Sequence, residues 1–144
     1  MGSPYVYYRI DAPTELKRER ACVVSGLDWH ADLAMIRRFY ARFGCGVQPD
    51  EFGQHVGSPL AIVQDGEIVS LAIPLSFREG ETEIGGVATV PDRRGEGWCE
   101  ALIAELASRI LAEGKAAALT TGQDNLPMRR AAERIGMKRV PPRA

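Results

Sequence analysis

Residues 81–105, ETEIGGVATVPDRRGEGWCEALIAE, constrain the fold of this 144-residue chain more than any other stretch. The first half is rich in β-branched residues and stops at Pro91, which is typical of a strand that runs into a turn. From Trp98 onward apolar residues recur at helical spacing, as Leu102 and Leu106 illustrate. We therefore predict a strand, a glycine-rich turn and an amphipathic helix in direct succession.

The turn in this stretch has the features of an anion-binding site. Gly95 and Gly97 relieve the backbone of Cβ constraints, and the first N–H groups of the following helix have no intrahelical acceptor. The helix macrodipole adds positive potential at the same point, and Arg94 adds a guanidinium group. A pyrophosphate would fit such a site. The alternative is a tight turn whose glycines serve backbone geometry alone.

Two familiar phosphate-binding loops do not match this turn. It contains no G-K-S/T sequence of a Walker loop, and Glu100 stands where the dinucleotide fingerprint needs its third glycine. The pattern that remains, P-x-x-R-G-x-G before a helix, resembles the central motif of the GNAT acyltransferase superfamily, Q/R-x-x-G-x-G/A. Arg94, Gly97 and Cys99 occupy its three fixed positions, with Cys99 in place of the usual Gly or Ala.

A second motif of the same superfamily begins at Asn125. In the family it reads N-x-x-S/A-x-x-x-Y-x-x-x-G-F. Asn125, Gly136 and Met137 match this pattern, whereas Met128 and Ala132 depart from it. The two motifs stand in the family's order, and the resemblance covers more than half of the chain.

The resemblance implies an α/β fold with a central, splayed mixed sheet flanked by helices, in one domain over residues 1–144. Residues 1 to about 59 would form the acceptor side, and residues from about 60 to 140 the acyl-CoA-binding core. The implied activity is an N-acyltransferase that moves an acyl group directly from acetyl-CoA, or another acyl-CoA, to an amine acceptor. The sequence identifies neither the amine nor the acyl chain.

The resemblance also implies which residues contact the cofactor. Backbone N–H groups of six loop residues would hold the pyrophosphate: Arg94, Gly95, Glu96, Gly97, Trp98 and Cys99. Three residues of the preceding strand, next to a bulge, would pair with the pantetheine arm and direct an N–H group at the thioester carbonyl: Val87, Ala88 and Thr89. Asn125 would hydrogen-bond the pantetheine or cap the next helix, and both roles stay open.

Glu83 is the predicted catalytic base. An amine with a pKa near ~10 is mostly protonated at neutral pH, so a base assists its attack. Glu83 stands where many family members carry a catalytic glutamate, and the neighbouring Glu79 and Glu81 would raise its pKa. The alternative is a solvated carboxylate at the end of a strand.

Ala132 replaces the tyrosine that protonates the leaving thiolate in the family, which leaves the general acid unidentified. A second interpretation is therefore a catalytically impaired module that binds acyl-CoA as a regulatory ligand. Cys99 would lie at a helix N-terminus, where thiol pKa values fall, so it could form an acyl-cysteine intermediate. The alternative is that Cys99 is only a small residue that fills a Gly or Ala position. A nucleotide-binding protein of another class is the third alternative.

Composition narrows the range of partners. A net charge of −1 and a pI of about 6.1 give no field that would attract nucleic acid or an anionic membrane. No apolar run approaches the ~20 residues of a transmembrane helix, and no leader pattern precedes the first strand, so we expect a cytoplasmic protein. Three scattered cysteines and two isolated histidines predict no metal site and no disulfide framework.

The remaining segments follow the family's element order except at the end. Beyond Val140 no candidate is left for the family's final strand, so the sheet edge would stay open or be completed by a second chain in a homodimer. The other predicted elements are a first strand at 5–10 or 21–26, a helix from Asp28 to Gly44, a short helix at 49–56, and a hairpin at 60–73.

Overall fold

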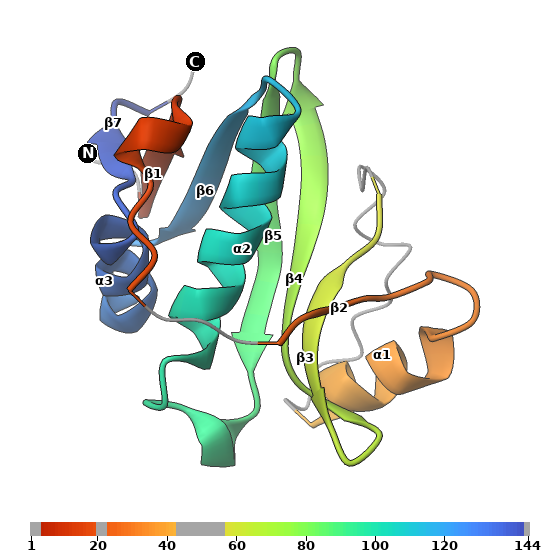
Figure 1. Cartoon of the computed structure of the whole chain (residues 1–144). Helices are drawn as coiled ribbons and strands as arrows, with labels where there is room; N and C mark the ends of the chain where they lie inside the picture. The colour runs from red at the N-terminus through yellow and green to blue at the C-terminus, as the bar shows by residue number, and fades with distance from the viewer. Residues whose placement is uncertain (1–3, 20–22, 43–56, 143–144) are drawn as a thin grey trace.

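The computed structural model describes residues 4–19, 23–42 and 57–142, which form a seven-stranded mixed sheet and three α-helices (Figure 1). This is the α/β architecture that the resemblance implies. The elements in chain order are β1 (Tyr5–Ile10), a 3-10 helix (Pro13–Glu15), β2 (Ser25–Gly26), α1 (Leu33–Ala41), β3 (Leu60–Gln64), β4 (Glu67–Arg78), β5 (Glu81–Thr89), a 3-10 helix (Pro91–Arg93), α2 (Trp98–Ala112), β6 (Ala116–Gly122), α3 (Leu126–Arg134) and β7 (Lys138–Val140).

The sheet has the strand order β2-β3-β4-β5-β6-β1-β7. Neighbouring strands run antiparallel except β5 and β6, which are parallel. The pairing of β5 with β6 ends where Glu83 lies opposite Ala118. Beyond this pair the two strands have no paired positions, so the sheet opens into a V between them.

Helices cover both faces of the sheet. Pro74 of β4 lines a small cavity together with Leu106 of α2, so its side chain faces α2. Ile73, the preceding residue of the strand, faces the other side. A Cβ built on Gly86 would touch both Ile73 and Tyr40 of α1. Therefore α1 packs on the face opposite α2, while α3 lies beside α2 (Figure 1).

The predicted helix after the glycine turn is α2, and its apolar positions form part of the core. Leu102 and Ile103 are completely buried. Gly114, with a left-handed φ of +80°, ends the helix and leads into β6. The predicted hairpin is formed by β3 and β4, and its turn residues Asp65 and Gly66 have φ values of +53° and +75°.

The helix predicted from Asp28 begins later than expected. The Asp28 carboxylate accepts hydrogen bonds from the backbone N–H groups of His30 and Ala31, at 2.8 and 2.7 Å, and so closes a turn ahead of the helix. The helix α1 itself begins at Leu33. The predicted end at Gly44 and the short helix at 49–56 lie outside the described residues.

The sheet is completed by the N-terminal strand of the same chain. β1 pairs antiparallel with β6 on one side and with β7 on the other. The place between β6 and β7 is therefore occupied by a strand of the same chain, whereas the predicted homodimer stays a prediction. Of the second candidate for the first strand, at 21–26, only Ser25–Gly26 forms a strand, β2, which pairs with β3 at the far edge.

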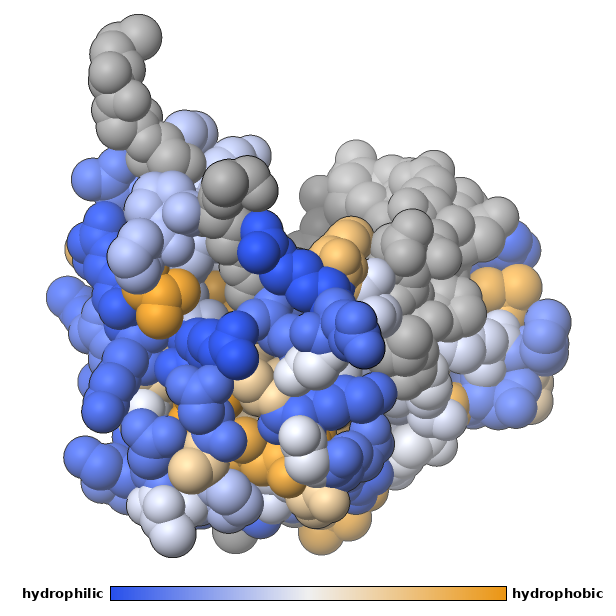
Figure 2. All heavy atoms as spheres, turned by 90° about the horizontal axis from the view of Figure 1, so that it is seen from above, coloured by the Kyte–Doolittle hydropathy of each residue, from blue (hydrophilic) through white to orange (hydrophobic). Residues whose placement is uncertain are grey.

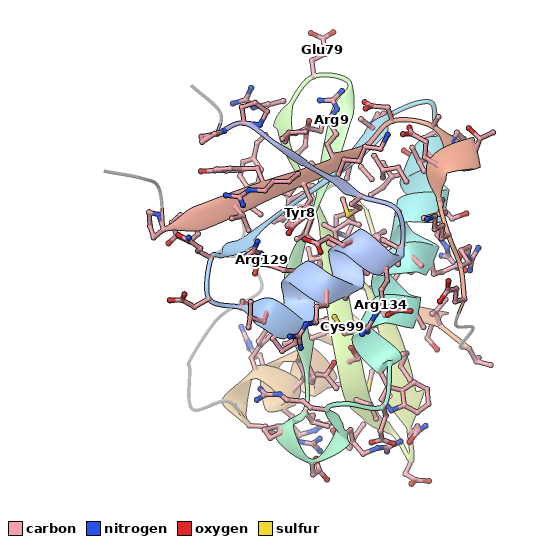
Figure 3. The ribbon with its side chains drawn as sticks, turned by 90° about the vertical axis from the view of Figure 1, so that its left-hand side faces the viewer. Tyr8, Arg9, Glu79, Cys99, Arg129 and Arg134 are labelled. Atoms are coloured by element: carbon pink, nitrogen blue, oxygen red, sulfur yellow. The ribbon has the colours of Figure 1, made fainter. Side chains whose placement is uncertain are left out.

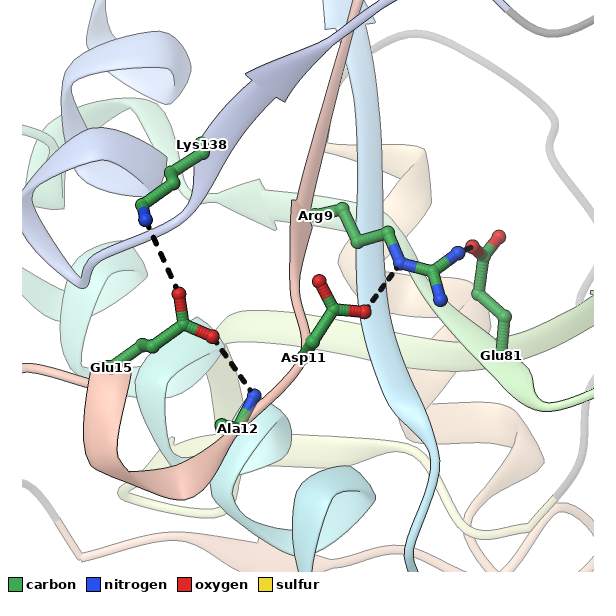
Figure 4. Close-up of polar contacts among 6 residues, drawn as sticks. All are labelled: Arg9, Asp11, Ala12, Glu15, Glu81 and Lys138. Atoms are coloured by element: carbon green, nitrogen blue, oxygen red, sulfur yellow. Dashed lines mark hydrogen bonds and ion pairs between the residues drawn. The ribbon is translucent and has the colours of Figure 1, made fainter.

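Ion pairs fix β1 and its flanking segment to the rest of the sheet (Figure 4). The Arg9 guanidinium contacts Asp11 at 2.7 Å and Glu81 of β5 at 2.6 Å, and the Glu81 side chain is only 4% exposed. Glu15 accepts a hydrogen bond from the Ala12 N–H and pairs with Lys138 at 3.4 Å. Elsewhere hydrophilic side chains dominate the described surface when it is seen from above (Figure 2).

Candidate functional site

A cavity of about 620 Å³ opens beside the V of the sheet. Its walls come from the end of β5, from the loop that precedes α2, from the first turn of α2, and from one side of α3. The cavity brings together nine of the ten predicted cofactor contacts: Val87, Ala88, Thr89, Arg94, Gly95, Gly97, Trp98, Cys99 and Asn125. The exception is Glu96, whose side chain turns away to pair with Arg93 at 2.9 Å.

The loop before α2 needs glycine for its backbone conformation. Gly95 and Gly97 have φ values of +82° and +84°, and a Cβ on Gly95 would meet no atom within 4 Å. Space is therefore not what selects glycine at Gly95. Gly97 is also the N-cap of α2 and offers no side-chain acceptor, so the first N–H groups of a 15-residue helix remain for an anion at the cavity wall.

Arg93 and Arg94 give this loop a rigid, positively charged frame. The Arg94 Nε donates to the Thr89 carbonyl at 3.2 Å. Arg93 stacks on the Trp98 ring at 5.4 Å from its centroid and donates to the Gln64 side chain at 2.7 Å. This role of Arg93 could not be predicted, because its partner Gln64 lies 29 residues away on β3.

The arginines of α3 divide between the cavity and the side of the helix that faces β1. Arg130 and Arg134 line the cavity, whereas Arg129 donates to the Tyr8 hydroxyl at 3.3 Å and to a loop carbonyl. Figure 3 shows Arg129 directed toward Tyr8. Two of these three arginines therefore line the cavity.

A carboxylate also lines the cavity, which sequence reasoning missed. The side chain of Glu100 is 7% exposed and pairs with Arg134 at 3.3 Å. Because the two residues lie 34 positions apart on different helices, no local pattern could have shown the pair. Arg134 offsets a negative charge that would otherwise repel an anion.

The pKa of the Cys99 thiol is raised, whereas its position at a helix N-terminus predicts a lowered pKa. Burial, reinforced by the negative charge of Glu100, raises the pKa of Cys99 to about 12. Its Sγ lies 3.9 Å from the sulfur of Met128. Loss of hydration outweighs the helix dipole here, so the predicted activation of this thiol is wrong and an acyl-cysteine has no support.

Glu83 lies at the vertex of the V but does not line the cavity. Its Oε1 accepts a hydrogen bond from the Thr120 hydroxyl of β6 at 2.8 Å. The charge of Glu81 is balanced by Arg9, and Glu79 points into solvent at the tip of the β4–β5 turn (Figure 3). The two acids predicted to strengthen Glu83 as a base therefore form no cluster of like charge with it.

Asn125 both caps α3 and contacts the cavity. Its Oδ1 accepts from the Met128 N–H at 3.4 Å, and its Nδ2 donates to the Thr121 hydroxyl at 3.1 Å. Ala132, at the position of the family's tyrosine, is completely buried. Among the described cavity residues the one hydroxyl belongs to Thr89, which is bonded to Ser70 at 2.9 Å.

The described residues contain neither a cluster of metal ligands nor a membrane-spanning helix. No group of three or more His, Cys, Asp or Glu side chains is placed to hold a metal ion in residues 4–19, 23–42 and 57–142. Over the same ranges, no helix has both the length and the apolar character to cross a membrane.

Comparison with solved structures identifies the fold. A putative GNAT-family acetyltransferase from Novosphingobium aromaticivorans superimposes with a TM-score of 0.75 at 18% identity, over 93% of this chain and 58% of that one. The ribosomal-protein-S18-alanine N-acetyltransferase of Escherichia coli gives 0.65 at 20% identity, over 79% and 76% of the two chains. An aminoglycoside N-acetyltransferase solved with CoA gives 0.65 at 16% identity, over 85% and 96%.

Several similar GNAT-fold structures are much longer than this chain. In three of them, including the Novosphingobium protein, the chain covers 58%, 52% and 54% of their length. No curated protein matches the sequence. A family model described as FR47-like protein matches residues 61–141, which is more than half of the chain and includes both sequence motifs. The chain thus belongs to the FR47-like family and has the fold of the GNAT acyltransferases.

Proposed function

We propose that this protein is an acyl-CoA-dependent N-acyltransferase that transfers an acetyl group, or a related acyl group, to an amine. The observation that supports this most directly is the cavity, which joins an uncapped helix N-terminus to the open V of a splayed sheet. One end suits a pyrophosphate, and the other leaves strand backbone available to an extended ligand.

The residues of the cavity fit acyl-CoA. The N–H groups of the loop at 94–99 would hold the pyrophosphate, with Arg94 fixing the loop against β5. Residues 87–89 of β5 would pair with the pantetheine arm. The indole N–H of Trp98 is buried without a hydrogen-bond partner in the described structure, which leaves one more donor for a ligand oxygen. The thioester supplies the acyl group.

Glu83 would take the proton of the amine from the other side of the V. Its bond to Thr120 holds the carboxylate at the vertex, where the pairing of β5 with β6 ends. The preceding residue, Thr82, lines the small cavity with Leu106 of α2, so Glu83 faces the other side of the sheet. The acceptor would therefore approach from the face opposite α2, and the acyl group would pass directly to it.

Ala132 favours a second candidate function, a module that binds acyl-CoA without efficient catalysis. At this position the chain carries a buried methyl group instead of a hydroxyl, and Thr89 is already bonded to Ser70. A thiolate with a pKa near ~8.5 can leave without a dedicated acid, so the loss slows the reaction without forbidding it.

Calorimetric titration with acetyl-CoA and CoA, combined with a thiol-release assay on a panel of simple amines, tests both candidates. Binding with amine-dependent thiol release is the result expected for the acyltransferase. Binding of acyl-CoA without release on any amine would favour the binding module. If neither compound binds, both candidates are refuted.

A further inference from the structure

The strand β5 contains a bulge that Tyr40 of α1 holds in place. The register of β4 on β5 shifts between Leu71 and Ile73, so Gly86 and Val87 have no partner positions on β4. Gly86 adopts a left-handed φ of +58° at this bulge. The Tyr40 hydroxyl donates a hydrogen bond to the Gly86 carbonyl at 2.9 Å.

Tyr40 and Gly86 are fitted to each other. Tyr40 is 5% exposed, and its ring packs edge-on against Phe39 at 5.2 Å between centroids. A Cβ on Gly86 would lie 3.0 Å from the Tyr40 hydroxyl oxygen and 2.8 Å from the Ile73 Cδ1. The hydroxyl therefore reaches the bulge because residue 86 has no side chain.

This hydrogen bond determines where the next N–H group points. The Gly86 carbonyl and the Val87 N–H belong to one peptide unit, and in a trans peptide they point in opposite directions. Since α1 lies on the face opposite α2, Tyr40 draws the carbonyl toward that face. The Val87 N–H consequently turns toward the face that holds α2, α3 and the cavity, which Val87 lines.

We propose that Tyr40 is a positioning residue, which orients and polarises the peptide between Gly86 and Val87 so that the Val87 N–H donates to the acyl carbonyl of the bound ligand. This inference rests on the proposed acyl-CoA function. A donor aimed at the carbonyl oxygen stabilises the negative charge that develops there during transfer. Hydrogen bonding to the carbonyl end of a peptide strengthens its N–H end as a donor.

The test uses acetyl-CoA labelled with carbon-13 at the carbonyl and follows the carbonyl stretch by isotope-edited infrared spectroscopy. Binding to the unmodified protein should lower the frequency of this stretch. In Tyr40→Phe at least half of that lowering should disappear. Affinity for acetyl-CoA should fall by about threefold to tenfold, the range of one hydrogen bond, while affinity for CoA, which has no acyl carbonyl, should change by less than about twofold.

Two further variants separate positioning from a purely structural effect. Tyr8→Phe removes another buried tyrosine hydroxyl bond, the 2.6 Å contact with Glu133, and should leave the carbonyl frequency unchanged. Gly86→Ala disturbs the bulge while keeping Tyr40, and should reproduce the loss seen in Tyr40→Phe.

An unchanged frequency in Tyr40→Phe with acetyl-CoA bound would overturn the inference and leave the proposed function standing. Equal losses in Tyr40→Phe and Tyr8→Phe would also overturn it. If the unmodified protein binds neither acetyl-CoA nor CoA, the proposed function fails as well.

Discussion

Replacing Gly95 with alanine should weaken the cofactor loop through backbone strain alone. The φ of Gly95 is +82°, and its added Cβ would meet no atom within 4 Å, so no steric clash contributes. An L-residue in the left-handed region costs about 1–2 kcal/mol relative to the right-handed region. The strained loop has two ways to respond, either by keeping its conformation or by relaxing to a different one.

The same strain energy lowers the free energy of unfolding in the first response and the free energy of CoA binding in the second. If the loop keeps its conformation, the free energy of unfolding falls by about 1–2 kcal/mol and CoA binding is unchanged. If the loop relaxes, unfolding changes little, and the strain must be supplied on binding, which weakens CoA by about tenfold for each 1.4 kcal/mol. We therefore expect the losses in unfolding and binding free energy to add up to about 1–2 kcal/mol. Urea unfolding and calorimetry measure the two quantities.

Gly114 provides a matched control for this experiment. It has a φ of +80° and likewise no atom within 4 Å of an added Cβ, but it lies at the far end of α2 from the cavity. Gly114→Ala should therefore lose stability without losing affinity for CoA. Gly95→Asn should lose less than Gly95→Ala, because asparagine tolerates the left-handed region. The reasoning is refuted if Gly95→Ala matches the unmodified protein in both measurements, or if Gly114→Ala weakens CoA equally.

Three further predictions concern the site. Glu83→Gln should lower turnover by about 10²-fold to 10⁴-fold and leave the affinity for CoA unchanged. If single-turnover kinetics show acyl transfer at the unmodified rate, Glu83 is not the catalytic base. Arg130→Gln should weaken CoA by about twofold to fivefold in calorimetry, whereas Arg139→Gln, on β7 outside the cavity, should not. Because the pKa of Cys99 is raised to about 12, its alkylation by iodoacetamide should be slow at pH 8 and should accelerate with rising pH up to about pH 12. Unfolding should make the alkylation fast. The rate is measured in a variant whose other two cysteines are serine, and a plateau of the rate below pH 9 would contradict the prediction.

The parts of the fold that could be predicted are those with a local signal. The apolar spacing from Leu102 to Ile110 indicated α2, and the glycines at 95 and 97 indicated the loop, because each pattern lies within a few residues. The place of β1 could not be predicted, since the strand pairs with β6 more than a hundred residues away.

The chemistry of the site was less accessible to prediction for the same reason. The raised pKa of Cys99 depends on burial beneath α3, and the Glu100–Arg134 pair joins two helices. Tyr40 carries no motif, and its contact with Gly86 spans 46 positions. Local sequence shows which residues can perform a reaction, whereas distant packing determines their protonation and direction.

The position of β1 between β6 and β7 also imposes an order on folding. Tyr5 is synthesised well before Gly122, its partner in the sheet, so β1 lacks this neighbour until β6 has left the ribosome. At ~5–20 residues per second, roughly 110 further residues take about 6–20 s to appear. Until then β1 is an unpaired strand with three tyrosines and two β-branched residues, open to mispairing with other chains. Completion of the sheet should accordingly be the late step of folding, and β1 the segment that a chaperone would protect.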